Sequence, residues 1–231
     1  MNEGKKNIKE KIFAFIRPLW MWIRKISPKG TYLQLGNYRV KDRTVPKIDR
    51  LFGRTRNKID ILNYEVNCIS ALRKHVKYGD QITIVGGGYG ITGIVAMEKG
   101  GVVTLIEPSK ARVDDILETW KQYNLKGTVI HGFVGSVISI WGDLNGAEKI
   151  DTLPNCDILE LDCEGAEKEI LSKLNIEPRI IVVESHGHLG SPSSLVKSLL
   201  ISKGYRISDE MVENLENDII VIVGENNKVQ K

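Results

Sequence analysis

Cysteine is scarce in this chain, and its cysteines form no recognisable pair. Cys68, Cys156 and Cys163 make neither a C-x-x-C motif nor a Cys/His cluster with the spacing of a metal site. The odd, small number argues against a disulfide framework and predicts free thiols in a reducing compartment. We therefore expect a cytoplasmic protein without a structural metal.

Long apolar runs and an excess of one charge are missing as well. No uninterrupted apolar stretch reaches about 18 residues, which argues against a membrane-spanning helix. The apolar stretch near the N-terminus is not followed by a small-residue cleavage site, so no signal peptide is expected. The 33 basic and 29 acidic residues give a net charge of +4, too small to indicate a nucleic-acid partner.

What the chain does contain suits one large domain with an extension. Of its 231 residues, 42% are hydrophobic and 27% are charged, as in an ordinary globular protein. Residues 1–60 are expected to form an amphipathic helix and an irregular extension, because Pro28, Gly30, Gly36, Pro46 and Gly53 interrupt any long period. Residues 61–231 are expected to form the main domain.

In the main domain, β-branched runs alternate with amphipathic segments, a pattern typical of an α/β fold with a mainly parallel sheet. Helices are expected over residues 64–77, 92–99 and 109–123, over 166–174, and from Pro192 onward. Seven strands are expected, near residues 81–85, 102–106, 128–130, 157–161, 179–184, 205–207 and 219–223. The last two have no helical pattern between them and predict an antiparallel hairpin at the sheet edge.

A glycine-rich turn follows the first of these strands. Strand, turn and helix in this order place backbone N–H groups and a helix N-terminus at the carboxyl end of a parallel sheet, where cofactors bind. The turn fits two patterns: Gly88-x-Gly90-x-x-Gly93 matches a dinucleotide site, and Gly86-x-Gly88-x-Gly90 matches a methyltransferase site. Glu107, which closes the next strand, could hold ribose hydroxyls in either case.

A second motif lies downstream, where residues 157–167 read D-I-L-E-L-D-C-E-G-A-E. This segment resembles the D-x-x-K-x-D-x-E-G-A-E signature of the FkbM-type methyltransferase family. Other segments follow in that family's order, over roughly residues 63–223: Tyr64-Glu65, Gly79-Asp80, Glu107-Pro108, residues 150–153 and Glu184-Ser185-His186.

The resemblance implies a Rossmann-like methyltransferase fold, S-adenosyl-L-methionine as cofactor, and O-methylation of a sugar, glycan or other small hydroxylated acceptor. With the glycine turn, it assigns cofactor binding to Glu65, Val85, Gly86, Gly87, Gly88, Tyr89, Gly90, Glu107, Pro108, Asp162 and Glu164.

Three positions depart from the family's pattern. Ile84 stands where an Asp usually precedes the turn, Gly88 replaces a common Asn, and Glu160 stands where the family often has Lys. The first change removes a carboxylate that helps to organise the amino-acid end of the cofactor.

Ionisable side chains follow the fourth and fifth predicted strands. Asp162, Glu164, Glu184, His186 and His188 are expected at the sheet edge that carries the glycine turn, so they could converge on one cleft. An alcohol acceptor needs a group that takes its proton, and imidazole titrates near neutral pH. We therefore predict His186 as the base, with Asp162 and Glu184 beside it. The same three residues are chemically able to bind a metal, but no spacing motif demands one.

Two other functions remain compatible with the sequence. A nicotinamide-dependent oxidoreductase could use the Gly88-x-Gly90-x-x-Gly93 turn, although it would have no evident use for the D-x-E-G-A-E segment. A non-catalytic binding protein could keep the fold without the activity, and Ile84 is the main support for that reading.

The N-terminal segment, residues 1–27, is basic and amphipathic. Its helical spacing fits contact with an anionic membrane surface, a cover over the substrate cleft, or packing against a second subunit of a homo-oligomer. Pro18 would kink the helix. The apolar positions are Ile8, Ile12, Phe15, Ile16, Leu19, Trp20 and Ile23, and the basic ones are Lys5, Lys6, Lys9, Lys11, Arg17, Arg24 and Lys25.

Overall fold

The computed structural model describes residues 18–46, except 20, 24 and 28, together with residues 63–136 and 144–228. The predicted boundary between the extension and the main domain, at residues 60 and 61, lies outside the described residues. So does most of the predicted N-terminal helix. None of the helices in the described part is long and apolar enough to cross a membrane.

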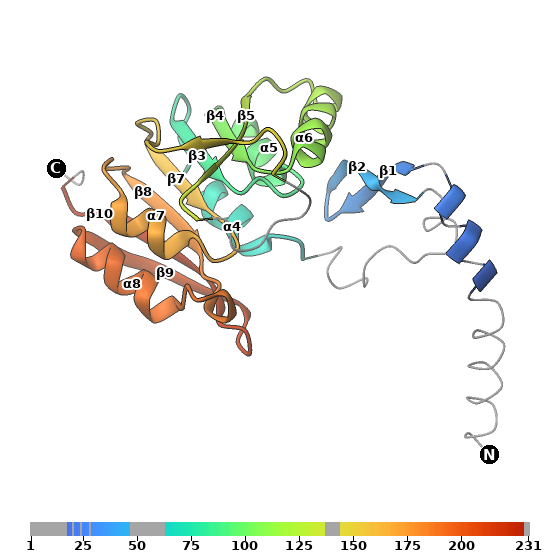
Figure 1. Cartoon of the computed structure of the whole chain (residues 1–231). Coiled ribbons are helices and arrows are strands. Elements are labelled where there is room, and N and C mark those ends of the chain that lie inside the picture. Colours follow the sequence, from blue (N-terminus) through green and yellow to red (C-terminus); the bar gives the residue numbers. More distant parts are fainter. Residues whose placement is uncertain are drawn as a thin grey trace, which may run out of the picture.

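A large sheet forms the centre of the chain (Figure 1). Its strand order is β6-β5-β4-β3-β7-β8-β10-β9, in which the first six strands are parallel and β10 is antiparallel to both of its neighbours. The strands are β3 Gln81–Val85, β4 Val102–Glu107, β5 Thr128–Val134, β6 Glu148–Ile150, β7 Ile158–Leu161, β8 Ile180–Glu184, β9 Tyr205–Asn214 and β10 Ile219–Asn226.

This architecture confirms the predicted α/β fold and its antiparallel C-terminal hairpin. The sheet has eight strands rather than the predicted seven, because β6 adds a short edge strand beside β5. The segment Glu148–Ile150 lacks the β-branched run that marks the central strands, and it is held at the edge by backbone pairing with β5 and by the packing of Ile150 against the core.

Helices cover both faces of the sheet (Figure 1). Buried side chains of α4, α5 and α6 join one core cluster, and those of α7 and α8 join the other. The central strands are therefore buried on both sides, which is why they read as continuous apolar runs. The helices are α4 Val66–His75, α5 Ile91–Glu98, α6 Lys110–Gln122, α7 Glu167–Lys173 and α8 Ser193–Ser202, and the 3₁₀ turn η1 is Gly187–Leu189.

Four of these helices, α4, α6, α7 and α8, begin one or two residues later than predicted. α4 starts at Val66 because Glu65, with a φ of 49°, is in the left-handed region and cannot continue a right-handed helix. α8 starts at Ser193, and Pro192 is its N-cap rather than its first helical residue.

The prediction of an irregular extension is wrong for residues 29–46. These residues form an antiparallel hairpin, β1 Lys29–Leu35 and β2 Tyr38–Pro46, joined through residues 36 and 37. Gly36 has the positive φ that such a tight connection requires. Leu33, Leu35 and Val40 are buried, so the alternation of apolar residues was the strand signal.

The hairpin is fixed to α6 and to the glycine turn by buried polar contacts. The Tyr89 hydroxyl donates to Asp42 at 2.7 Å, and the Arg112 guanidinium lies 3.4 Å from the same carboxylate oxygen. The Arg43 Nε donates to Asp115 at 2.7 Å. Asp42 is 1% exposed, so these partners and Thr44 stabilise its negative charge in place of water.

Replacing Asp42 should therefore destabilise the fold strongly. In the Asp42→Ala variant, the buried Arg112 charge and the Tyr89 hydroxyl lose this carboxylate, which should lower the free energy of unfolding by about 3–5 kcal/mol. Denaturant unfolding followed by circular dichroism measures the change. Asp209→Ala, which removes an exposed ion pair with Lys74, is the control and should cost about 1 kcal/mol or less. Equal losses for both variants would contradict the structural role of Asp42.

Candidate active site

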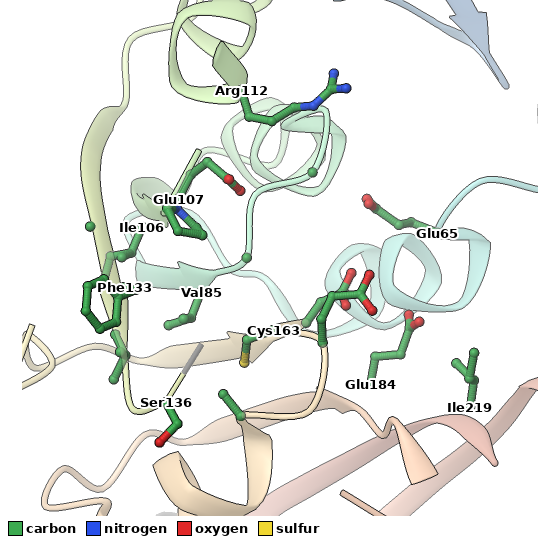
Figure 2. Close-up of a pocket in the computed structure, with 18 of the residues that line it drawn as sticks. Glu65, Val85, Ile106, Glu107, Arg112, Phe133, Ser136, Cys163, Glu184 and Ile219 are labelled. Carbon is green, nitrogen blue, oxygen red and sulfur yellow. The ribbon is translucent and has the colours of Figure 1, made fainter. Parts of the chain in front are cut away.

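A cavity of about 260 Å³ opens at the carboxyl ends of the parallel strands (Figure 2). Apolar side chains such as Ile106 and Phe133 line one side of it, and Glu65 and Glu184 lie on the opposite side. Of the residues predicted to bind cofactor, eight line this cavity: Glu65, Val85, Gly86, Gly88, Glu107, Pro108, Asp162 and Glu164.

The glycine turn packs against the chain on both sides. A Cβ atom on Gly86, where φ is 91°, would lie 1.6 Å from the carbonyl oxygen of Asp162. A Cβ atom on Gly90 or on Gly93 would meet the Trp120 ring of α6 at 3.0 or 2.4 Å. The Gly88-x-Gly90-x-x-Gly93 pattern is thus accounted for partly by the packing of Trp120, without a dinucleotide.

Three predicted cofactor residues do not line the cavity: Gly87, Tyr89 and Gly90. Tyr89 is the clearest difference from the prediction. Its side chain is buried beneath the hairpin, where it donates to Asp42, and the Arg112 guanidinium lies 4.5 Å from the centre of its ring. The tyrosine therefore has a structural role that sequence position did not indicate.

Glu107, at the end of β4, is held in place by the backbone around it. Its carboxylate accepts hydrogen bonds from the Gly87 N–H at 3.0 Å and the Ser109 N–H at 2.8 Å. Burial raises the pKa of Glu107, while these two N–H groups oppose the change. The residue is nearly buried yet lines the cavity, so lone pairs on its oxygens remain available to hydroxyl donors.

Two acidic residues of the cavity wall have left-handed backbones. Glu65 and Glu164 have φ values of 49° and 50°, which are uncommon for residues other than glycine. Such conformations cost free energy and concentrate at functional sites. Glu65 belongs to the Tyr64-Glu65 motif, and Glu164 belongs to the D-x-E-G-A-E motif. In both cases the turn presents a carboxylate to the cavity.

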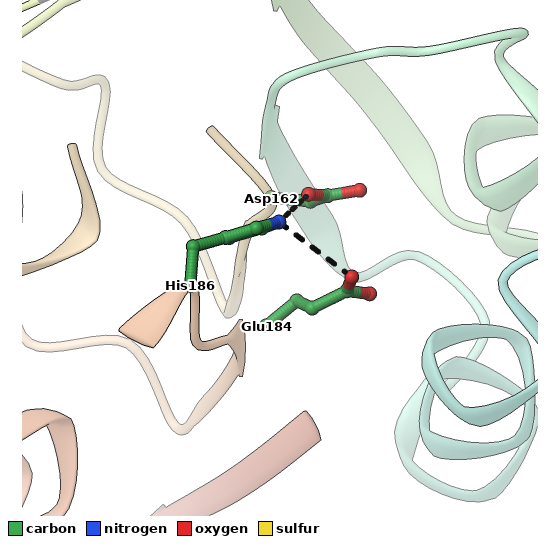
Figure 3. A group of neighbouring side chains, drawn as sticks. All are labelled: Asp162, Glu184 and His186. Atoms are coloured by element: carbon green, nitrogen blue, oxygen red, sulfur yellow. Dashed lines mark ion pairs between the residues drawn. The ribbon is translucent and has the colours of Figure 1, made fainter. Parts of the chain in front are cut away.

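The predicted convergence of acidic residues and histidine at the strand ends is confirmed (Figure 3). The His186 Nε2 atom lies 3.6 Å from Asp162 Oδ1 and 3.7 Å from both Glu184 Oε1 and Glu164 Oε2. On the other side of the ring, Nδ1 is 3.0 Å from Glu167 Oε1. His188, by contrast, lies on η1 with its ring 6.1 Å from that of His186.

Burial and mutual repulsion shift the ionisation of this cluster. Burial raises the pKa of Asp162 to about 7, with further increases from Glu164 and Glu167 that His186 opposes. Burial likewise raises the pKa of Glu184 to about 10, helped by Asp162 and Glu65. For His186 burial lowers the pKa, but the hydrogen bond to Glu167 and the nearby carboxylates raise it to about 9. Groups perturbed in this way mark functional sites.

The position of His186 differs from the expectation of a base facing an acceptor. The side chain is 3% exposed and lies behind Asp162, Glu164 and Glu184, which line the cavity while His186 does not. With a pKa near 9 the ring already holds a second proton at neutral pH. These features favour the carboxylates as the groups that face an acceptor.

Two of the residues that depart from the FkbM sequence pattern, Ile84 and Glu160, are neighbours in the sheet. They are paired in register on β3 and β7, so their side chains share one face of the sheet. Burial raises the pKa of Glu160 well above its usual value, with contributions from Glu65 and Asp162, and favours a neutral acid. Where the family pattern has an Asp beside a Lys, this chain therefore has an Ile beside a buried carboxyl group.

Comparison with known proteins supports the fold. No protein-family model matches the chain, and no curated protein sequence matches it either. Among solved structures, the ribosomal protein L11 methylase of Lactobacillus delbrueckii subsp. bulgaricus is similar, with a TM-score of 0.52 and 12% identity, over 71% of this chain and 79% of that one.

Two further structures are similar over more of this chain. The M. jannaschii tRNA m1G37 methyltransferase has a TM-score of 0.54 and 14% identity, over 86% of this chain and 57% of its own. Methanocaldococcus jannaschii Trm5 in complex with adenosine has a TM-score of 0.56 and 11% identity, over 87% and 56%.

At such identities the likeness concerns the fold alone. One of these proteins is a methylase of a ribosomal protein and another is a tRNA methyltransferase, so the fold does not select an acceptor. The mild net charge is accordingly not a sufficient reason to exclude nucleic acid. The chain has the Rossmann-like fold of S-adenosylmethionine-dependent methyltransferases.

Proposed function

We propose that this chain is an S-adenosyl-L-methionine-dependent methyltransferase of FkbM type, which methylates a hydroxyl group of a sugar, glycan or other small molecule. One observation carries the proposal. The Glu107 carboxylate, fixed by Gly87 and Ser109, lines the same cavity as the Asp162 and Glu184 carboxylates, at the carboxyl edge of a sheet with the methyltransferase fold.

The cavity residues fit the proposed cofactor. Glu107 offers acceptors to ribose hydroxyls, and Ile106, Pro108 and Phe133 provide an apolar wall for a base. Near Asp162 and Glu184, the acidic wall favours a positive charge such as that of a sulfonium. When bound, the cofactor supplies an electrophilic methyl group.

The chain's own residues position the acceptor and take its proton. Methyl transfer is an in-line displacement, so a cavity that holds the acceptor in one orientation contributes much of the rate. Asp162, with a pKa near 7, is suited to accept a hydroxyl proton at neutral pH. Behind Asp162, His186 and Glu167 form a buried ion pair with each other.

The charge of the cavity supports a small hydroxylated acceptor over a nucleic acid. Within the described residues its lining has six carboxyl groups and one guanidinium, that of Arg112. Such a wall disfavours a phosphate backbone and offers many hydrogen-bond acceptors to hydroxyl groups. The carboxyl groups belong to Glu65, Glu107, Asp162, Glu164, Glu184 and Glu213.

The sheet order argues against a nicotinamide-dependent oxidoreductase. Dinucleotide-binding sheets of the doubly wound type have the order 3-2-1-4-5-6. In this chain the antiparallel strand β10 lies between β8 and the edge strand β9. The D-x-E-G-A-E segment also has a use here, since it provides Asp162, Glu164 and Glu167.

The first prediction for this function concerns Glu107. Glu107→Ala should raise the dissociation constant for S-adenosylhomocysteine about 10- to 100-fold, because charged hydrogen bonds contribute about 1.5–3 kcal/mol. Isothermal titration calorimetry measures the constant. Glu107→Gln, which keeps one acceptor oxygen, should lose less, and Glu216→Ala, an exposed glutamate, should lose nothing. An unchanged constant in Glu107→Ala, or stabilisation of the protein by NAD alone, would contradict the assignment.

A second prediction concerns the acceptor. Incubating the protein with methyl-labelled cofactor and fractionated extracts should place the label in the glycan or small-molecule fraction. Asp162→Asn should reduce that labelling by about 100-fold or more, through loss of the proton acceptor, while S-adenosylhomocysteine binding persists. Label in the RNA fraction would overturn the proposed acceptor class, and full labelling by Asp162→Asn would overturn the role of Asp162.

We also propose that this chain, as a cytoplasmic protein, contacts an anionic membrane surface through residues 1–27. Among the described residues of this segment, Leu19, Met21, Trp22 and Ile26 are all more than half exposed. None of them lines the cavity. Clustered apolar side chains beside many Lys and Arg residues favour an anionic lipid surface over a cover for the cleft.

Liposome flotation tests this contact with the full chain. The wild type should float with vesicles that contain phosphatidylserine, and the double substitution Trp22→Ser and Ile26→Ser should abolish most of that binding. Leu215→Ser, which changes an exposed apolar residue on the β9–β10 connection, is the matched control and should float normally. Equal flotation of the wild type and the double variant would exclude membrane contact through this segment. A wild type that forms dimers and does not float would exclude it as well.

A further inference from the structure

His186 directs one ring nitrogen into the group of carboxylates at the end of the cavity (Figure 3). The distances from Nε2 to Asp162, Glu184 and Glu164 are 3.6, 3.7 and 3.7 Å, longer than a hydrogen bond. The side chain is 3% exposed, and within the described part of the chain Nε2 has no hydrogen-bond partner. A buried ring nitrogen is therefore aimed at three carboxylate oxygens at ion-pair distance, without a hydrogen bond to any of them.

The opposite ring nitrogen is fixed by Glu167. That carboxylate is fully buried and accepts from the backbone N–H groups of Cys163 and Gly165. Because every backbone partner of Glu167 is a donor, the carboxylate acts as an acceptor, and Nδ1 of His186 donates to it at 3.0 Å. Nε2 then points into the cluster, and a cation bound there would replace its proton. A carboxylate that orients a histidine in this way is the usual outer partner of a metal ligand.

The spacing of the cluster also suits a cation. Ligand atoms about 2.1 Å from a tetrahedral cation lie about 3.4 Å from one another. The ligand atoms of Asp162, Glu184 and His186 all lie within 4.8 Å of one another, and His186 Nε2 lies 3.6 and 3.7 Å from the two carboxylate oxygens. A small inward movement of the carboxylates would complete such a sphere.

We propose that Asp162, Glu184 and His186 bind a divalent cation, with Glu164 as a neighbouring fourth carboxylate. One imidazole with two or three carboxylates suits Mn²⁺ or Zn²⁺ better than Mg²⁺, which prefers an all-oxygen set. Asp162, Glu164 and Glu184 line the cavity, so the cation faces the space for the acceptor. Resting on the proposed methyltransferase function, a cation placed here would act as a Lewis acid toward the acceptor hydroxyl, and the hydroxyl proton would pass to the Asp162 oxygen that is not a ligand.

A cation at this place differs from the expectation, drawn from the sequence, of a protein without a metal. The ligands come from Asp162, just after β7, and from residues 184 and 186 at the end of β8. Parallel pairing of these strands, with Leu161 opposite Val183, brings them to one edge. No local spacing motif could have indicated that arrangement.

Calorimetric titration of the full chain, freed of metal by EDTA, tests the site. With MnCl₂ or ZnCl₂ it should show one cation bound per chain, and with MgCl₂ at least tenfold weaker binding. Asp162→Asn and Glu184→Gln should weaken Mn²⁺ binding about 100-fold or more, and Glu167→Gln about 10- to 100-fold. Glu216→Gln, which changes an exposed carboxyl group away from the cavity lining, should bind Mn²⁺ as the wild type does.

Pulsed electron paramagnetic resonance of the Mn²⁺ form supplies a second readout. An imidazole nitrogen coupling should be present in the wild type and in Glu164→Gln, and absent in His186→Gln. Circular dichroism checks that each variant is folded, and the partly exposed Glu164 keeps the titration informative if the buried His186 variant unfolds. Weaker Mn²⁺ binding by Glu164→Gln supports the site.

The proposal is overturned if neither Mn²⁺ nor Zn²⁺ binds more tightly than millimolar. It is also overturned if Asp162→Asn and Glu184→Gln bind Mn²⁺ like the wild type, or if the nitrogen coupling is missing. Titration with S-adenosylhomocysteine separates the two proposals. If the cofactor product binds and the cation does not, the metal site is wrong and the methyltransferase proposal stands. If the cation binds and the cofactor product does not, the metal site stands and the methyltransferase proposal is wrong.

Discussion

The contact between Gly86 and the backbone of Asp162 is the constraint on which the rest of the site depends. The Asp162 carbonyl oxygen occupies the place that a Cβ atom of residue 86 would take, so only glycine can follow β3 there. The Asp162 N–H donates to the Val85 carbonyl, and the Gly86 N–H donates to the Ile106 carbonyl. These bonds join the ends of three adjacent strands, and they bring the glycine turn, the carboxyl end of β4 and the acidic cluster into one cavity.

That cavity concentrates acidic groups that the fold can neutralise only in part. Glu107 and Glu167 remain acceptors because backbone N–H groups face them. Within the described residues no backbone N–H group donates to Asp162 or Glu184, and burial raises the pKa of both. Repulsion from Glu164 and Glu167 raises the pKa of Asp162 further, and repulsion from Asp162 and Glu65 raises that of Glu184. A cluster of this kind favours a positive charge, whether a proton, a sulfonium or a cation, and this common preference links the cofactor, the base and the proposed metal ion.

The N-terminal hairpin supports the opposite side of the turn. Asp42 reaches from β2 to Tyr89 and Arg112, so the side chain in the middle of the glycine turn is held from outside the central domain. Arg112 also lines the cavity, and the hairpin thereby positions the guanidinium of the cavity wall. Local sequence could not show this, because residues 42, 89 and 112 are distant in the chain and each taken alone has no special pattern.

The sequence by itself determined the α/β class, most strands and helices, and the edge at which the site lies. Strand periodicity and the carboxyl-end rule depend on local pattern, and they correctly brought Glu107, Asp162, Glu184 and His186 to one edge of the sheet. Tertiary structure alone decided which groups face the cavity. The Tyr89 side chain packs under the hairpin, and His186 lies behind the carboxylates. Glu160 lies beside Ile84, and residues 29–46 form strands. These outcomes depend on pairing and burial between distant segments, which fix side-chain direction and solvation, and a local pattern contains neither.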